Sequence, residues 1–111
     1  MKEAWEATWL GERVYLEVTP ASFAEGWGKG AFFGLLGRPK ARSILLYGNQ
    51  VVDRREIDQP LLGIKFEFGL MGKAKQPDGQ EAQFYVRYTC KIYSECELQI
   101  NGTPVPVKRV S

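Results

Sequence analysis

Residues 83–107, QFYVRYTCKIYSECELQINGTPVPV, decide the fold of this chain because their polarity alternates with a period of two. Every second residue from Phe84 to Ile92 is apolar, aromatic or cysteine, and the same holds from Cys96 to Ile100. Such alternation is typical of strands that bury one face. Asn101-Gly102 follows, and this pair predicts a tight hairpin turn because both residues tolerate positive φ. The stretch therefore predicts an antiparallel meander, whose apolar face needs a second sheet to cover it.

The first twenty residues show the same alternation. Trp5 to Trp9 predicts the first strand, and Val14 to Val18 predicts the second, which Pro20 ends. We expect the turn between them at Gly11-Glu12. Aromatic side chains dominate core burial, so Trp5 and Trp9 are expected to pack inside, although an exposed binding role remains an alternative.

The middle of the chain predicts three more strands. Ser43–Tyr47 and Gln50–Arg54 flank Gly48-Asn49, which makes them a second hairpin. The run from Leu62 to Leu70 alternates cleanly between apolar and polar or small side chains. A polar run follows this strand, and Pro77-Asp78-Gly79 is expected to form its turn.

These elements predict the fold class. Seven or eight short strands without a helical period indicate one all-β domain over residues 1–111, an antiparallel β-sandwich, with a small β-barrel as the alternative. Residues 108–111 are expected to fray. Burying each large inward side chain stabilises the fold by about 1.5–3 kcal/mol. The expected core residues are Trp5, Val14, Leu16, Leu46, Ile64, Phe66, Phe68, Phe84, Val86, Leu98 and Ile100.

Residues 20–42, PASFAEGWGKGAFFGLLGRPKAR, break the pattern. Glycine at this density disfavours both helices and strands, yet the stretch is rich in large apolar side chains. We expect a long loop that either caps one end of the core or docks on a partner, a ligand or a membrane surface; a short helix over Gly30–Leu36 is a third interpretation. Long loops are often functional. The candidate partner-binding residues are Trp27, Lys29, Phe32, Phe33, Leu36, Arg38 and Lys40.

The composition excludes several kinds of chemistry. Histidine is absent, which removes the usual general base and the commonest metal ligand. Two cysteines cannot build a structural zinc site. Of the 13 acidic residues, none stands out as a catalytic pair, because most occupy outward positions of predicted strands. We therefore expect no catalytic residue, no metal and no cofactor.

Charge and hydropathy bear on partners and compartment. A net charge of +2 is small for a nucleic-acid-binding domain, so nucleic acid is not the expected partner. The chain has no apolar run of about 18 residues that could span a membrane. The first nine residues lack the apolar core of a secretory signal, so a cytoplasmic location is expected.

The two cysteines leave one question open. Cys90 and Cys96 would face each other, within reach of a disulfide, only if the turn between them centres on Tyr93. We expect reduced thiols that face the core, because the expected compartment is reducing and cysteine is often a small buried apolar residue.

Four segments within residues 43–107 show a shared pattern: Ile44-Leu45-Leu46-Tyr47-Gly48-Asn49, Asp53-Arg54-Arg55-Glu56, Ile64-Lys65-Phe66 and Leu98-Gln99-Ile100-Asn101-Gly102. In these segments the chain resembles one repeat of the Fas apoptotic inhibitory molecule family. The resemblance implies an antiparallel β-sandwich that works by binding, without catalysis. Residues 20–40 depart from the family pattern as a long insertion, and no functional residue of the family maps onto a position here.

Three functions are consistent with the sequence. The first is a non-catalytic protein-interaction domain, including one that associates with itself, which uses the apolar loop or an exposed sheet edge. The second is a carrier of a small apolar ligand, with the loop as a lid over a cavity of several hundred Å³. The third is a single-stranded nucleic-acid binder in which Tyr85, Arg87 and Tyr93 stack on bases. The interaction domain is the function that we expect.

Overall fold

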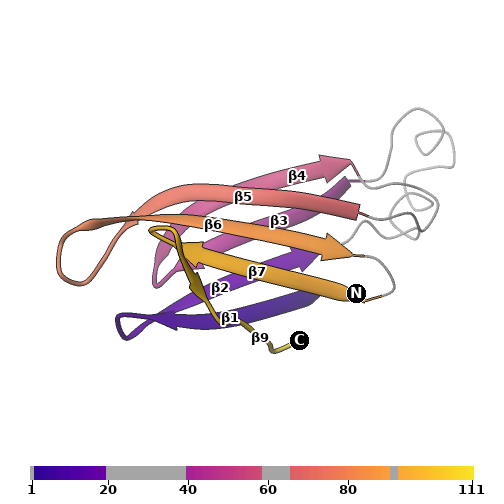
Figure 1. Cartoon of the computed structure of the whole chain (residues 1–111). Helices are drawn as coiled ribbons and strands as arrows, with labels where there is room; N and C mark the ends of the chain where they lie inside the picture. The colour runs from indigo at the N-terminus through magenta and orange to yellow at the C-terminus, as the bar shows by residue number, and fades with distance from the viewer. Residues whose placement is uncertain (1, 20–39, 59–65, 91–92) are drawn as a thin grey trace, which may run out of the picture.

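The computed structural model describes residues 2–19, 40–58, 66–90 and 93–111; Lys40, Asp58 and Phe66 are described by their backbones alone. These residues form two antiparallel sheets that pack face to face, without a helix and without closure into a barrel (Figure 1). The predicted all-β sandwich is therefore confirmed. The described residues form nine strands, of which the last two are very short.

Five strands form sheet A. In chain order they are β1 (Glu3–Trp9), β2 (Glu12–Thr19), β3 (Lys40–Tyr47), β4 (Gln50–Asp58) and β9 (Lys108–Arg109). Their spatial order is β4-β3-β2-β1-β9, and all neighbours are antiparallel. The strand β3 begins inside the stretch that was expected to be a loop up to residue 42, so the predicted loop is too long at this end.

Four strands form sheet B. They are β5 (Phe66–Lys75), β6 (Glu81–Cys90), β7 (Ser94–Ile100) and β8 (Thr103–Val105), in the spatial order β5-β6-β7-β8. Strand β5 extends further than expected, because Ala74 continues the inward alternation and is buried. The turn at residues 77–79 is where the sequence predicts it.

The tight turns follow from backbone conformation. Asn101 and Gly102 have φ values of 54° and 79°, which confirms the predicted turn with positive φ at both positions. The first hairpin turns at Leu10-Gly11, with φ values of 52° and 78°, and not at Gly11-Glu12. The pairing of Trp9 with Glu12 requires this shift, because a two-residue loop must lie between paired residues.

The core fills the space between the sheets. Seven of the predicted core residues are buried there, and Phe68 packs against them while partly exposed. Leu46 is not in the core, so this prediction is wrong: Leu45 and Tyr47 are buried instead. Leu16 pairs with Leu45, which turns Leu45 inward and Leu46 outward. Ile64 and the side chain of Phe66 lie outside the described residues. The seven confirmed residues are Trp5, Val14, Leu16, Phe84, Val86, Leu98 and Ile100.

The expectation that residues 108–111 fray is wrong, because the end of the chain forms a short strand. Lys108 and Arg109 pair with Glu6 and Trp5 of β1, so the chain crosses from sheet B to sheet A after β8. The backbone N–H of Val110 also donates to the carbonyl of Ala4 at 2.8 Å. This short strand covers part of the edge of β1.

Both cysteines are free thiols. Cys96 pairs with Tyr88 and Cys90 pairs with Ser94, so the two cysteines are not opposite each other on β6 and β7. The expectation of reduced thiols agrees with this register. Burial raises the pKa of Cys96 to about 12, with a smaller contribution from Glu97. A thiol with so high a pKa is a poor nucleophile at neutral pH.

Side chains join β4 of sheet A to β5 of sheet B. The Gln50 amide donates to the carbonyl of Lys75 at 2.7 Å and accepts from its N–H at 2.8 Å, as a backbone partner in a ladder would. The Asp53 carboxylate accepts from the N–H of Met71 at 2.9 Å. These bonds close one side of the sandwich and occupy edge groups that would otherwise invite another strand.

Candidate protein-interaction surface

The outer face of sheet A carries an apolar row that crosses three strands. Tyr15 of β2 pairs with Leu46 of β3, and Leu46 pairs with Val51 of β4. Ile44 lies two residues before Leu46 and therefore on the same face. We call Tyr15, Ile44, Leu46 and Val51 the sheet A patch. Its first three members are half-buried, and Val51 is 51% exposed.

The local sequence explains why β3 presents apolar side chains outward. Ile44 and Leu46 face outward while Leu45 and Tyr47 are buried, so this strand is apolar on both faces. Strands of this kind are typical of sheets that are covered on both sides. Within the described residues, sheet B covers one face of β3, and the other carries the sheet A patch.

A β-bulge completes the patch. The pairing of β3 with β4 shifts between Leu45, which pairs with Asp53, and Leu46, which pairs with Val51. One extra residue, Val52, is thereby inserted into β4. The insertion places Val51 beside Leu46, while Val52 packs against the core. Regular pairing would have put Val52 beside Leu46 instead.

Polar contacts hold the aromatic end of the patch. The Tyr15 hydroxyl donates to the Glu17 carboxylate at 3.0 Å, and the Arg13 guanidinium lies 4.4 Å from the centre of the Tyr15 ring. Arg13 in turn pairs with Glu6 at 3.1 Å. Burial, followed by the hydrogen bond to Glu17, raises the pKa of Tyr15. The hydrogen bond to Glu17 and the contact with Arg13 hold the ring in place.

Charges of opposite sign lie on either side of the patch. Ile44 pairs with Glu17 of β2 on one side and with Arg54 of β4 on the other. One rung further towards the start of β3, Arg42 and Glu56 form an exposed ion pair at 3.8 Å. An apolar centre with a polar rim of both signs is the usual composition of a protein-binding surface.

The outer face of sheet B is a weaker candidate. Met71 and Tyr85 pair there and are exposed, with Gly69 beneath the Tyr85 ring. Arg87 is held by the Glu67 carboxylate at 2.9 Å and pairs across the sheet with Glu97. These carboxylates offset the charge that a phosphate backbone would need.

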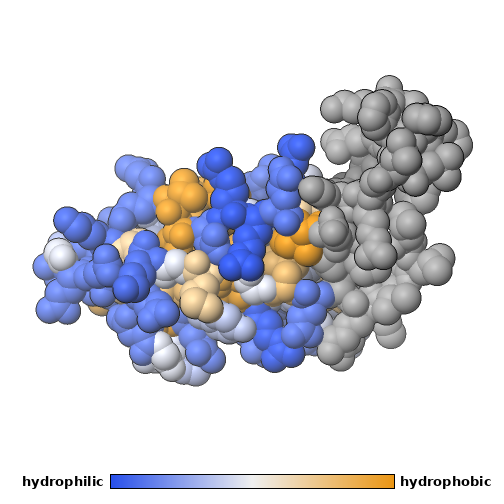
Figure 2. Space-filling model, turned by 90° about the horizontal axis from the view of Figure 1, so that it is seen from above, coloured by the Kyte–Doolittle hydropathy of each residue, from blue (hydrophilic) through white to orange (hydrophobic). Residues whose placement is uncertain are grey.

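The side of the molecule on which β4 and β5 lie uppermost in Figure 1 is mostly hydrophilic. Figure 2 looks down on this side and shows hydrophobic atoms in small separate groups.

Tyr93, the third residue expected to stack on bases, lies in the connection between β6 and β7 and is 71% exposed. Nothing in this arrangement favours nucleic-acid binding over protein binding.

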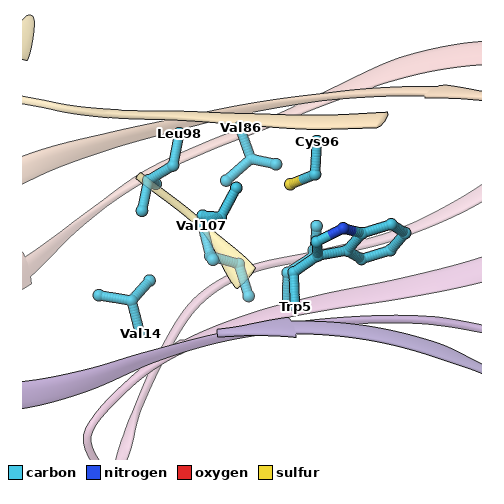
Figure 3. Close-up of a pocket in the computed structure, with 8 residues that line it drawn as sticks. Trp5, Val14, Val86, Cys96, Leu98 and Val107 are labelled. Atoms are coloured by element: carbon cyan, nitrogen blue, oxygen red, sulfur yellow. The ribbon is translucent and has the colours of Figure 1, made fainter. Parts of the chain in front are cut away.

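The void that the described residues line between the sheets is too small for a ligand. A void of about 10 Å³ lies between Trp5 of one sheet and Cys96 of the other, with Val107 to one side of both in the space between the sheets (Figure 3). Such a void is at the lower limit for a single water molecule. The cavity that a ligand carrier would need beneath residues 20–39 lies outside the described residues and stays a prediction. The other lining residues are Val14, Leu16, Leu45, Val86 and Leu98.

A polar cluster around Glu3 has a structural explanation. The Glu3 carboxylate accepts from the hydroxyls of Tyr88 at 2.6 Å and Ser94 at 2.7 Å, and Arg109 lies 3.4 Å away. These bonds tie β1 to β6, β7 and β9. Among the described residues, no group of three or more His, Cys, Asp or Glu is arranged to hold a metal ion. The part of the chain that the structure describes also contains no helix able to cross a membrane.

None of the residues predicted to bind a partner belongs to the sheet A patch. Lys40 begins β3, but its side chain lies outside the described part of the chain. The other predicted residues lie wholly outside it and stay predictions: Trp27, Lys29, Phe32, Phe33, Leu36 and Arg38. The sequence-based expectation missed the sheet A patch because Leu46 was assigned to the core. The available signal was the run Ile44–Tyr47, which is apolar at every position and so on both faces.

Comparison of the chain with protein-family models, with curated proteins and with solved structures gives no match. The resemblance of residues 43–107 to the Fas apoptotic inhibitory molecule family therefore stays a prediction.

Proposed function

We propose that this chain is a non-catalytic protein-interaction domain of the cytoplasm that binds its partner through the sheet A patch. The observation that carries the proposal is the apolar row Tyr15–Leu46–Val51 on the face of sheet A that sheet B does not cover. Contiguous apolar groups on an exposed face, rimmed by charges, mark interaction sites. The free thiols of Cys90 and Cys96 suit a reducing compartment.

The face is a better contact than the neighbouring edge of the sandwich. Gln50 and Asp53 already bond the backbone of β5 where β4 and β5 meet, so an added strand would have to displace them. Within the described part of the chain no side chain bonds across the patch in this way, so a partner that covers it removes water from Ile44, Leu46 and Val51. Each large apolar side chain contributes roughly 1.5–3 kcal/mol when it passes from full exposure to full burial, and half-buried ones contribute less. The loop-based contact at residues 20–39 stays an additional prediction.

Site-specific photo-crosslinking in the source cells tests this proposal. A benzophenone side chain placed at Val51 should give covalent adducts with a partner protein. The same group placed at Met71, on the outer face of sheet B, is a matched control because the two side chains are 51% and 52% exposed. We expect adducts from position 51 and few or none from position 71.

A second variant shows that the patch, and not mere proximity, produces the adducts. Leu46→Gln removes an outward apolar side chain at the centre of the patch and should abolish crosslinking from position 51 while the thermal unfolding curve stays cooperative. Equal adduct yields from positions 51 and 71, or no adduct at position 51, would overturn the proposal.

A further inference from the structure

The rung through Ile44 has an arrangement of charge that restricts the choice of partner. On the outer face of sheet A, Glu17 lies one strand to one side of Ile44, and Arg54 lies one strand to the other. Within its own chain the Glu17 carboxylate also lies 3.6 Å from the Lys2 ammonium, so a second copy's Arg54 would share it with Lys2. The next rung carries the Tyr15 ring, Leu46 and Val51, with Glu6 beyond Tyr15 on β1. The outer face thus has a central strand with apolar Ile44 and Leu46, an acid on the β2 side and a base on the β4 side, and both charges pair with Ile44.

This arrangement is complementary to itself. Consider two copies whose outer faces meet about a two-fold axis that runs parallel to β3 and passes between the two β3 strands. The rotation keeps each rung at its height and exchanges β2 with β4. Ile44 and Leu46 then meet their own counterparts, and Tyr15 meets Val51 of the second copy. Glu17 of each copy meets Arg54 of the other, which gives two equivalent charge pairs.

The usual twist between packed sheets leaves this match intact. Packed faces cross at about 30° and lie about 10 Å apart. Glu17 and Arg54 are each one strand, about 4.8 Å, from the axis, so the crossing angle displaces them by only about 2.5 Å. Long flexible side chains can cover such a displacement. Arg42 also falls on the axis, but each copy holds its own Glu56 carboxylate 3.8 Å from this guanidinium, which offsets the like charge.

The face is of the size of a weak, transient interface. Under this rotation three strands of sheet A, β2, β3 and β4, meet their counterparts, and at about 4.8 Å spacing and about 26 Å length they give a flat face of about 370 Å². This area is roughly half of the ~800 Å² per partner of a standard interface, as in weak and transient complexes. Since isologous contacts require a self-complementary patch, this face meets the condition for a symmetric homodimer.

We infer that the partner of the sheet A patch is a second copy of this chain, packed outer face to outer face about a two-fold axis parallel to β3. The inference rests on the proposed function, because it names the partner of the same patch. It predicts that the protein in solution has about twice the 12.6 kDa mass of one chain.

Charge reversal provides a sharp test by sedimentation velocity. Glu17→Arg alone places two Arg pairs across the interface, and Arg54→Glu alone places two Glu pairs there. Each single variant is expected to sediment as a monomer, with association weakened more than tenfold. An equimolar mixture of the two variants restores both opposite-charge pairs and should form a heterodimer. Glu95→Arg, an exposed reversal on the outer face of sheet B, is the control and should sediment as the wild type does.

The outcomes separate this inference from the proposed function. A wild-type protein that is monomeric at millimolar concentration, or a mixture of variants that stays monomeric, would overturn the homodimer. Single variants that remain as dimeric as the wild type would overturn this interface. If adducts from position 51 then contain a different protein, the proposed function survives while the inference of a second copy fails. Thermal unfolding of each variant checks that the monomers are folded.

Discussion

The Glu3 side chain joins β1 to three strands that are distant from it in the sequence. Its carboxylate is only 14% exposed and binds Arg109 as well as the hydroxyls of Tyr88 and Ser94. The edge of the Tyr88 ring contacts Trp5, with ring centres 5.4 Å apart, so an apolar contact supports the polar one. Burial, followed by the hydrogen bond to Glu3, holds the pKa of Tyr88 far above its usual value.

This raised pKa makes the stability sensitive to alkaline pH. Between the ordinary tyrosine pKa of about 10 and the folded value, Tyr88 loses its proton only when the chain unfolds. The contribution of Tyr88 to the unfolding free energy is therefore fully present below about pH 10. Above about pH 10 this contribution falls by about 1.4 kcal/mol per pH unit. Tyr88→Phe should reduce the slope of unfolding free energy against pH between about 10 and 11, measured by urea titration.

The variant has a second expected effect and a control. Tyr88→Phe removes a hydrogen bond to a carboxylate, which should lower stability at neutral pH by roughly 1.5–3 kcal/mol. Tyr93→Phe, at a side chain that is 71% exposed, should change neither quantity. An alkaline slope that is the same in Tyr88→Phe and in the wild type would show that the hydroxyl is not shielded as described.

Two hairpins of the sandwich use the same turn with different residues. Asn101-Gly102 between β7 and β8 and Leu10-Gly11 between β1 and β2 both place two successive residues at positive φ. Asn tolerates this conformation, whereas Leu rarely adopts it. Leu10 is also largely exposed, so no burial of its side chain offsets the strain. The first hairpin therefore carries a local cost that the last hairpin avoids.

Leu10→Asn should relieve this strain. We expect stabilisation by about 0.5–1 kcal/mol, because Asn fits the left-handed conformation that the turn imposes. Asn101→Leu should do the opposite, and more strongly, because the Asn101 side chain also accepts the N–H of Gln83 at 2.9 Å. Chemical denaturation of both variants measures the two changes. Destabilisation by Leu10→Asn would contradict the strain argument.

The two sheets come closest where β4 meets β5. Gln50 and Asp53 bond the backbone of β5, and Gly72 lies against the backbone of Val52. A Cβ atom at Gly72 would collide with the carbonyl group of Val52. Because the obstacle is backbone, it cannot move aside as the end of a flexible side chain could. This contact fixes the distance between the two sheets along one side of the sandwich.

Gly72→Ala should therefore destabilise the whole fold. We expect a loss of about 1–3 kcal/mol or more, as for other overpacked sites, because the sheets must separate locally. Gly69→Ala, in the same strand, is the control: its Cβ would lie 3.5 Å from the carbonyl oxygen of Val86, an ordinary contact. Equilibrium unfolding of both variants gives the comparison. Equal losses in the two variants would mean that the approach of β4 to β5 is not tight.

The sequence alone determined the strands, most of their inward faces and the Asn101-Gly102 turn. These features depend on neighbours along the chain: a period of two in polarity, and backbone preferences at single positions. For this reason Phe84, Val86 and Leu98 could be assigned to the core correctly. The absence of histidine likewise removes the usual general base and the commonest metal ligand on sequence grounds alone.

Only the tertiary structure decided which face of β3 is inside. Leu45 and Leu46 are equally apolar, so alternation fits either choice, and the pairing of Leu45 with Leu16 resolves it. The bulge that brings Val51 beside Leu46 depends in the same way on pairing. So does the strand formed by Lys108 and Arg109, which pairs with residues more than one hundred positions earlier. The candidate surface arises from these long-range pairings, because strand register is set by contacts between segments and not by the polarity of any one of them.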